Sequence, residues 1–83
     1  MFRSFTLRTI TCNGFPVDMK PEELEKLFQE FSPEKVEIKY NKFGVSLQTA
    51  KILFKERKWR QEVLNSIDSL EYNGTLIQIK PAN

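Results

Sequence analysis

The stretch that decides the fold is residues 36–54, VEIKYNKFGVSLQTAKILF. In residues 36–40, apolar side chains alternate with charged ones, which is the pattern of a strand with one buried face. Residues 41–44 (NKFG) favour a short turn or loop. Residues 49–54 again alternate, and the side chains on the apolar face are Ala50, Ile52 and Phe54. The stretch therefore predicts two strands joined by a turn.

A helix is predicted before this stretch. Pro21 suits the first helical position, and the acidic residues that follow it suit the positive end of a helix. One apolar stripe runs along the helix at the spacing i, i+3, i+4 and i+7, and consists of Leu24, Leu27, Phe28 and Phe31. Ser32-Pro33 ends the helix, because a residue before proline avoids the helical region.

The flanking segments complete a repeating order. Residues 5–12 are rich in β-branched residues and stop at the turn signal Asn13-Gly14, so they predict a first strand. Trp59, Val63, Ile67 and Leu70 are spaced as the stripe of a second helix. Asn73-Gly74 closes that segment, and residues 76–80 predict a last strand with Ile77 and Ile79 facing inward.

The order strand–helix–strand–strand–helix–strand predicts an α+β fold, the ferredoxin-like βαββαβ sandwich. We expect a four-stranded antiparallel sheet with both helices on one face, because right-handed crossovers place them there. The 83 residues suit one domain over 1–83, with its core in about 5–80. The expected core residues are Leu24, Phe28, Ile38, Ile52, Phe54, Val63, Ile67 and Ile79.

Composition excludes several kinds of chemistry. The sequence has no histidine and one cysteine, Cys12, which excludes Ser-His-Asp catalysis, imidazole metal sites and an internal disulfide. We expect no cofactor and no metal. No apolar run is long enough to predict a membrane span, and a free thiol without a secretion signal favours an intracellular setting. The net charge of +2 does not identify a partner, but Lys51, Lys55, Arg57, Lys58 and Arg60 form a local basic run.

Three segments give the chain a resemblance to the RNA recognition motif (RRM) family. Residues 10–16 (ITCNGFP) resemble the six-residue RNP motif with its following proline. Residues 47–54 (LQTAKILF) stand in the place of the eight-residue RNP motif on the third strand. Tyr72-Asn73-Gly74 matches the family's usual turn before the last strand. The resemblance runs from Phe5 to Lys80 and implies an RNA-binding module whose open sheet face meets single-stranded RNA.

The residues that stack bases in this family are replaced. The family places aromatic rings at three positions of the two motifs, and here these positions hold Thr11, Thr49 and Lys51. Gln48 replaces the usual glycine, and Leu47 replaces the usual leading base. We therefore expect weak binding to a non-aromatic face. The RNA-binding candidates are Thr11, Asn13, Lys39, Phe43, Thr49, Lys51, Gln78 and Lys80.

Residues 40–54 are similar to mRNA-export adaptors of the Aly/REF type, which share the tyrosine, the glycine loop, Ser-Leu-x-Thr-Ala and the final Phe. This similarity implies a nuclear protein of mRNA processing or transport. The Arg/Gly-rich flanks of such adaptors are not present in these residues. We expect a monomeric domain.

Two other classes compete with RNA binding. Small phosphatases with this fold use an arginine and an asparagine near the first strand, but no glycine-rich phosphate loop precedes the first predicted helix, so we expect no enzyme. The alternative is a protein–protein interaction module with little RNA binding. The Arg-x-Phe of U2AF-homology modules is absent, since residues 69–72 are SLEY. The docking candidate on the helical side is Trp59.

Overall fold

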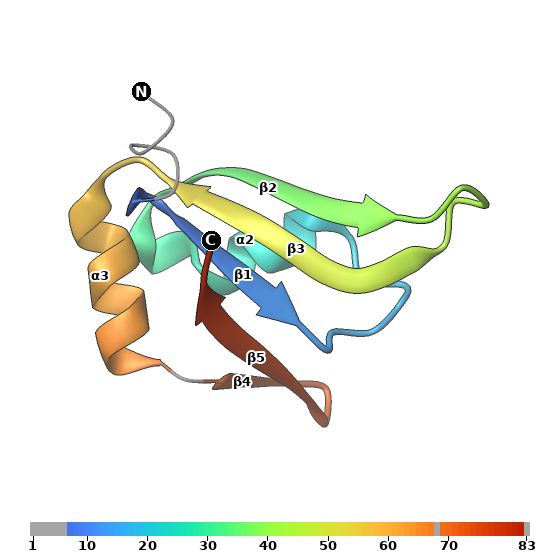
Figure 1. The fold of residues 1–83 in the computed structure, drawn as a ribbon. Helices are drawn as coiled ribbons and strands as arrows, with labels where there is room; N and C mark the ends of the chain where they lie inside the picture. The colour runs from blue at the N-terminus through green and yellow to red at the C-terminus, as the bar shows by residue number, and fades with distance from the viewer. Residues whose placement is uncertain (1–6, 68, 83) are drawn as a thin grey trace.

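Five strands form one antiparallel sheet in the computed structural model, which describes residues 7–67 and 69–82 (Figure 1). The elements in chain order are β1 (Thr9–Asn13), α2 (Pro21–Leu27), the 3-10 helix η1 (Gln29–Phe31), β2 (Pro33–Tyr40), β3 (Ser46–Phe54), α3 (Arg57–Ser66), β4 (Ser69–Tyr72) and β5 (Thr75–Pro81). The strand order across the sheet is β2-β3-β1-β5-β4. The predicted α+β sandwich is therefore confirmed.

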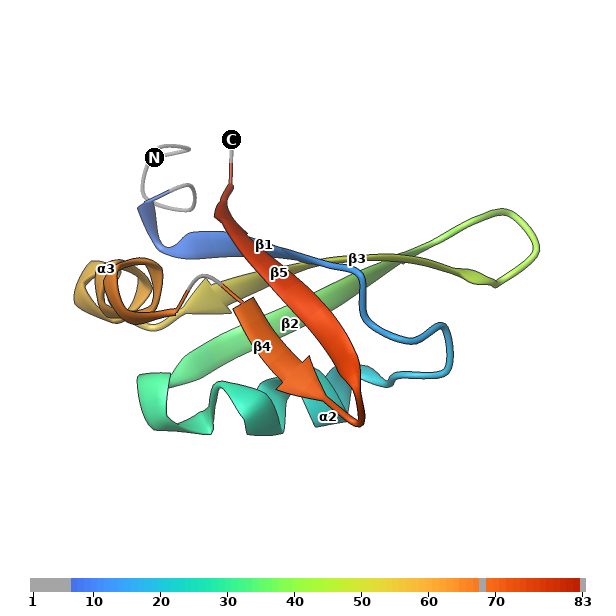
Figure 2. The same ribbon diagram turned by 90° about the horizontal axis from the view of Figure 1, so that it is seen from below.

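The helices connect strands that are not neighbours in the sheet. β1 and β2 lie on either side of β3, so the segment with α2 crosses over between them. Figure 2 shows α2 below the sheet and α3 beside the C-terminal end of β3. Both helices contribute to one buried cluster with the inward side chains of the strands: Leu24 and Phe28 come from the first helical segment and Val63 from α3. The other face of the sheet has neither helix on it.

The hydrophobic core follows the predicted faces closely. Of the expected core residues, all are buried except Ile67, which is half-buried against the cluster. The rings of Phe28 and Phe54 meet edge to face, with centroids 6.1 Å apart, a favoured aromatic geometry. Several buried residues were not predicted as core, among them Phe15 and Met19 in the loop between β1 and α2. That loop lacks the periodicity that identifies core positions in a helix or strand.

The fifth strand corrects the predicted four-stranded sheet. Leu70, expected on the stripe of the second helix, lies in β4 and pairs with Ile77 of β5. The helix ends at Ser66, and Ile67 is already extended. The turn that follows β4 explains the strand, because Asn73 and Gly74 both have positive φ, 50° and 81°. That pair of conformations is the tight hairpin turn for which Asn-Gly is favoured, so residues 69–72 fold back on β5.

The other element boundaries differ by a few residues. The first helix is α-helical only as far as Leu27, and residues 29–31 form a 3-10 turn. Ser32 then takes a left-handed conformation with φ 55°, and strand β2 begins at Pro33 rather than at Val36. β3 begins at Ser46 rather than Thr49. Of the predicted strand 5–12, residues 5 and 6 lie outside the described residues, and β1 begins at Thr9.

Candidate nucleic-acid interface

The helix-free face of the sheet is built by alternation along the middle of β1 and β3. In β1, Ile10 and Cys12 are fully buried among the core residues, so Thr11 and Asn13 point to the opposite face. In β3, Ala50 and Ile52 are buried, so Thr49 and Lys51 share that opposite face. We call this surface the open face.

A charged row crosses the open face. Register pairs Thr11 with Lys51 on one side and with Lys80 on the other, and Lys51 in turn with Glu37. Directly paired side chains in a sheet lie on the same face and in contact range. The row across strands β2, β3, β1 and β5 is therefore Glu37, Lys51, Thr11 and Lys80.

A neutral polar row lies beside the charged row, at residues two positions away on each strand. Asn13 pairs with Thr49 on one side and with Gln78 on the other, and Gln78 pairs with Ser69 of β4. The hydroxyl of Thr49 donates a hydrogen bond to Oδ1 of Asn13 over 2.6 Å. This bond joins β3 to β1 through side chains and sets the orientation of the Asn13 carboxamide.

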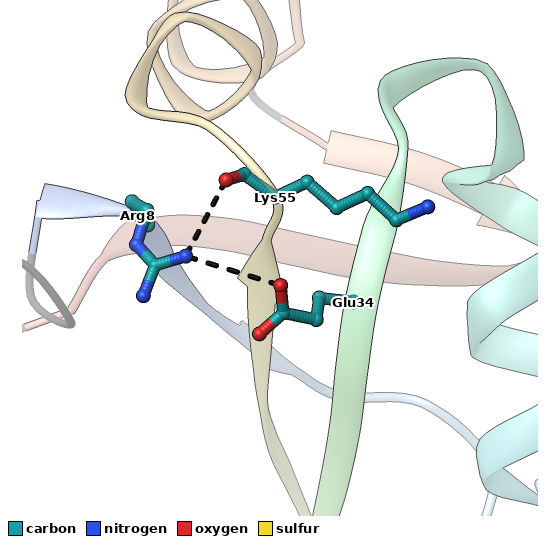
Figure 3. Close-up of polar contacts among 3 residues, drawn as sticks. All are labelled: Arg8, Glu34 and Lys55. Carbon is teal, nitrogen blue, oxygen red and sulfur yellow. Dashed lines mark hydrogen bonds and ion pairs between the residues drawn. The ribbon is translucent and has the colours of Figure 1, made fainter.

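The lysines of the charged row are available to a ligand. Lys51 and Lys80 are both exposed, and neither forms an ion pair with any residue in 7–67 or 69–82. Arg8 differs. Its guanidinium donates a hydrogen bond to the carbonyl of Lys55 over 3.3 Å and lies 4.0 Å from the carboxylate of Glu34 (Figure 3). Arg8 therefore braces the start of β1, and Lys51 and Lys80 supply the charge of the face.

The structure thus brings together six of the eight RNA-binding candidates, namely Thr11, Asn13, Thr49, Lys51, Gln78 and Lys80. Lys39 is exposed on β2, next to an irregularity in its pairing with β3. Phe43 lies apart from them, in the β2–β3 loop, with 78% of its surface exposed.

The β2–β3 loop has an ordered backbone despite its exposure. Oδ1 of Asn41 accepts hydrogen bonds from the backbone N–H groups of Phe43 and Val45. The ammonium of Lys42 lies 5.2 Å from the centre of the Phe43 ring, in cation–π range. The loop therefore presents one aromatic ring beside a positive charge, beyond the edge of the polar rows.

Gln48 has a strained backbone that is held by hydrogen bonds. Its φ is 59°, a left-handed conformation that glycine adopts without strain. The Gln48 amide donates to the carbonyl of Phe15 over 2.8 Å, and its backbone N–H donates to Oγ of Ser46. Its carbonyl accepts from the N–H of Gly14. These bonds offset the strain and fasten the β1–α2 loop to β3.

The basic run seen in the sequence is not one patch. Lys51 is on the open face, whereas Arg57 and Lys58 are exposed on α3. Nε of Arg60 donates to the carbonyl of Thr9 over 2.9 Å, so this side chain ties α3 to β1. Trp59 is half-buried against the core, with the Lys58 ammonium 5.0 Å from its ring centre.

Cys12, Glu23 and Tyr72 have shifted pKa values with structural causes. Burial raises the pKa of the Cys12 thiol to about 12, so the thiol stays protonated at neutral pH. The Tyr72 hydroxyl donates to Glu23, and this bond lowers the pKa of Glu23 and raises that of Tyr72. Within the described ranges, no cluster of His, Cys, Asp and Glu can hold a metal ion, and no helix is long and apolar enough to cross a membrane.

Sequence reasoning missed two residues of the open face. Ser69 completes the neutral row, but it was assigned to the segment around the second helix, so its place opposite Gln78 was not visible. Leu76 is 58% exposed and lies on the same side of β5 as Gln78 and Lys80. Strand alternation alone predicts that position for Leu76.

Comparison with known proteins identifies the fold through structure alone. No protein-family model and no curated protein sequence matches the chain. RNA recognition domains 1 and 2 of Sex-lethal from Drosophila melanogaster match with a TM-score of 0.81 and 20% identity, over 92% of this chain and 50% of that one. The Sex-lethal protein/RNA complex matches with a TM-score of 0.82 and 20% identity, over 92% and 47%. The RRM of RNA15 matches with a TM-score of 0.80 and 13% identity, over 92% and 90%.

The class defined by these comparisons is the RRM fold. The chain spans about half the length of the two Sex-lethal structures and nearly all of the RNA15 domain. The sequence expectation of this fold is confirmed.

Proposed function

We propose that the domain is a non-catalytic RNA-binding module that holds single-stranded RNA on its open face. The observation that carries the proposal is the charged row, in which Lys51 and Lys80 flank Thr11 without a partner in the described residues. Among proteins with this fold, one of the Sex-lethal structures is a complex with RNA. The row offers positive charge to phosphates, and the neutral row offers hydrogen bonds.

The expected affinity for RNA is low because aromatic rings are missing from three positions of the open face. A base stacked on an aromatic ring contributes ~1–3 kcal/mol, and the three stacking positions hold Thr11, Thr49 and Lys51. What remains is dominated by phosphate attraction, which falls with salt. We expect a dissociation constant of about 10⁻⁴ M or weaker for the domain near physiological salt, in the range of non-specific binding.

The test is an NMR titration of the domain with a short mixed-sequence RNA at several salt concentrations. Amide shifts should concentrate in β1, β3 and β5. Lys51→Ala should weaken binding and reduce the slope of log K against log salt by about one. Lys26→Ala is the matched control, because Lys26 is an exposed lysine on α2, on the helical side. Equal effects of the two substitutions would contradict the proposed surface.

We also propose the cellular setting that the similarity of residues 40–54 to Aly/REF-type adaptors implies. In this proposal the domain acts in the nucleus, in a protein of mRNA processing or export. Ultraviolet crosslinking followed by capture on polyadenylated RNA, from separated nuclear and cytoplasmic fractions, tests it. Crosslinked protein confined to the cytoplasm would reject the nuclear assignment without affecting the binding surface.

A second candidate function is a protein–protein interaction module, and a specific surface favours it. Between α2, η1 and β4 lies an open hollow lined by four half-buried apolar side chains, Leu27, Phe31, Ile67 and Leu70. Trp59 is also half-buried on the helical side. If RNA shifts no amide on the sheet and a partner shifts those of the helices, this function replaces RNA binding. Trp59→Ala should then weaken the binding of the captured partner protein.

A further inference from the structure

The outer edge of β2 is not paired with any strand in the described parts of the chain. β2 is the first strand in the order β2-β3-β1-β5-β4, so it has a neighbour on one side only, β3 (Figure 1). An edge strand presents backbone N–H and C=O groups that can pair with another strand. β2 has eight residues, whereas β4 at the opposite end of the sheet has four. β2 is therefore the longer template for an added strand.

The hydrogen bonds of β3 show which backbone groups of β2 point outward. The N–H of Phe54 donates to the carbonyl of Arg8 over 2.8 Å, so the even-numbered residues of β3 bond to β1. The odd-numbered residues bond to β2 on the other side, and among them Lys51 pairs with Glu37. The backbone groups of Glu37 therefore point into the sheet, and those of its two neighbours point to the outer edge.

The turn after β2 agrees with this assignment. The N–H of Asn41 donates to the carbonyl of Val45 over 2.9 Å, so the backbone of Asn41 faces the returning chain. The backbone groups of the preceding residue, Tyr40, therefore point outward. The outer edge thus presents the N–H and C=O groups of Val36, Ile38 and Tyr40.

The side chains of β2 are arranged symmetrically about Ile38. Ile38 is buried on the covered face of the sheet, so Glu37 and Lys39 on either side of it point to the open face, where both are exposed. Neither forms an ion pair with a residue in the described ranges. Two positions from Ile38 in each direction, Val36 is half-buried and Tyr40 is 50% exposed. One half of the strand is therefore complementary to the other half in charge and in apolar surface.

We infer that β2 pairs with β2 of a second copy of this chain, antiparallel and with Ile38 opposite Ile38. In this register Glu37 lies opposite Lys39 of the second copy, and Val36 lies opposite Tyr40 of the second copy. The two-fold symmetry of such a pair forms each contact twice. Opposite charges, and an aromatic with a β-branched side chain, stabilise antiparallel strands when they lie directly across from each other.

Other registers form fewer of these contacts. With Glu37 opposite Glu37, the outward backbone groups still meet, but like charges face each other, which is unfavourable. With Val36 opposite Val36, Glu37 meets Lys35, but Tyr40 then lies opposite Ser32, which precedes β2. The charges therefore disfavour the first alternative, and the lost apolar contact disfavours the second.

The paired copies present both open faces on the same side of one continuous sheet, because the two-fold axis is perpendicular to the sheet. A single-stranded RNA that reaches both charged rows gains affinity through the effective concentration of the second row. This consequence rests on the proposed RNA-binding function, whereas the pairing itself does not. The pair replaces the monomer that the sequence led us to expect.

Sedimentation velocity of the domain over a series of concentrations, without RNA, tests the pairing. We expect the average mass to rise from that of one copy toward that of two. Glu37→Lys and Lys39→Glu each place like charges across the pair twice, so each should weaken the dimer at least about tenfold. An equimolar mixture of these two variants should dimerise again, because opposite charges face each other in the mixed pair.

Lys35→Glu is the matched control. It makes the same change of charge on the same strand and face as Lys39→Glu, but position 35 lies opposite Asn41 in this register. It should change the dissociation constant of the dimer by less than about twofold. Amide hydrogen exchange gives a second measurement. The N–H groups of Val36 and Ile38 should exchange more slowly at high concentration, and that of Glu37 should not change.

Each other outcome rejects a defined part of the inference. A mass that stays at that of one copy, up to the concentrations of an NMR sample, would overturn the pairing. Equal weakening by Lys35→Glu and Lys39→Glu would reject the register, and a mixture that stays monomeric would reject the Glu37–Lys39 contact. Val36 and Ile38 amides protected only when another protein is added would assign the edge to that protein. Dimers that form while RNA shifts no amide would support the pairing and overturn only the proposed function. The dispersion of each variant's amide spectrum shows whether it is folded.

Discussion

The two faces of the same sheet respond to different constraints. On the covered face, Ile10, Ile52 and Phe54 are completely buried. On the open face, one residue away along the same strands, stand the side chains of Thr11, Thr49 and Lys51. Packing limits the covered face, since a change of volume in a close-packed core costs free energy. Solvent tolerates many side chains on the open face.

This difference shows which residues of each strand determine the fold and which determine what the domain can bind. The inward residues and their spacing define the RRM fold even though no family model matches the sequence. The outward residues define what the face can bind. Substitutions on the covered face should therefore change stability, whereas substitutions on the open face should change binding.

The largest effect is expected for Phe54→Ala. The ring is fully buried and contacts Phe28 edge to face, so its removal should cost about 3–5 kcal/mol of the free energy of unfolding. Denaturant unfolding followed by circular dichroism measures the loss. Phe43→Ala is the matched control, because its ring is 78% exposed, and it should change stability by about 0.5 kcal/mol or less. Similar losses in both variants would show that burial of the ring does not determine its contribution to stability.

The next effect restores stacking on the open face. Thr11→Phe combined with Thr49→Phe introduces two rings on neighbouring strands, each worth ~1–3 kcal/mol when it stacks a base. The double variant should bind single-stranded RNA at least tenfold more tightly, with an unchanged salt slope because no charge is altered. Titration calorimetry at two salt concentrations checks both statements. Unchanged affinity in a folded double variant would show that RNA does not lie on this part of the sheet.

A smaller effect concerns Gln48, where the β1–α2 loop is joined to β3. Gln48→Ala keeps the strained left-handed backbone and loses the hydrogen bond to Phe15, which is worth about 1 kcal/mol. Gln48→Gly loses the same bond but relieves the strain of roughly 1–2 kcal/mol. We therefore expect the glycine variant to be about 1 kcal/mol more stable than the alanine variant. Equal thermal stability of the two variants would mean that the left-handed backbone carries no strain.

The smallest effect is a pH dependence on the helical side. Hydrogen bonds from Tyr72 and from the backbone N–H of Lys20 lower the pKa of Glu23. A carboxyl with a lowered pKa in the folded state stabilises the fold at neutral pH, and this contribution is lost as the pH falls through that pKa. Thermal unfolding from pH 7 to pH 3 should show a smaller acid loss in Glu23→Gln than in the unsubstituted protein. An identical acid profile would contradict the role of this contact.

Sequence reasoning recovered the fold because the signals are local and repeated. Alternation identified the inward residues of β3 and β5, and the helical stripe identified Leu24 and Phe28. It missed Phe15 and Met19, because a loop residue becomes core only when the sheet closes over it. It also placed Leu70 in a helix, since a helical spacing continued by chance past Ser66 into β4.

For the candidate interface, alternation predicted that Lys51, Thr11 and Lys80 face away from the helices. It did not predict their partners. The two rows exist because antiparallel register sets Asn13 opposite Thr49 and Gln78, and register is set by the whole sheet and its turns. Nor did the sequence reveal that Arg8 and Arg60 are engaged in structural contacts, which removes Arg60 from the basic run.

The sequence by itself determined the order of elements and the inward and outward faces of each strand, because these depend on residue type and on periods of two and 3.6. Only the tertiary structure decided which outward residues become neighbours. Asn13 and Thr49 are 36 positions apart in the chain, yet they share a hydrogen bond of 2.6 Å. The physical reason is that strand pairing brings distant segments into register, and no local pattern in either segment encodes that register.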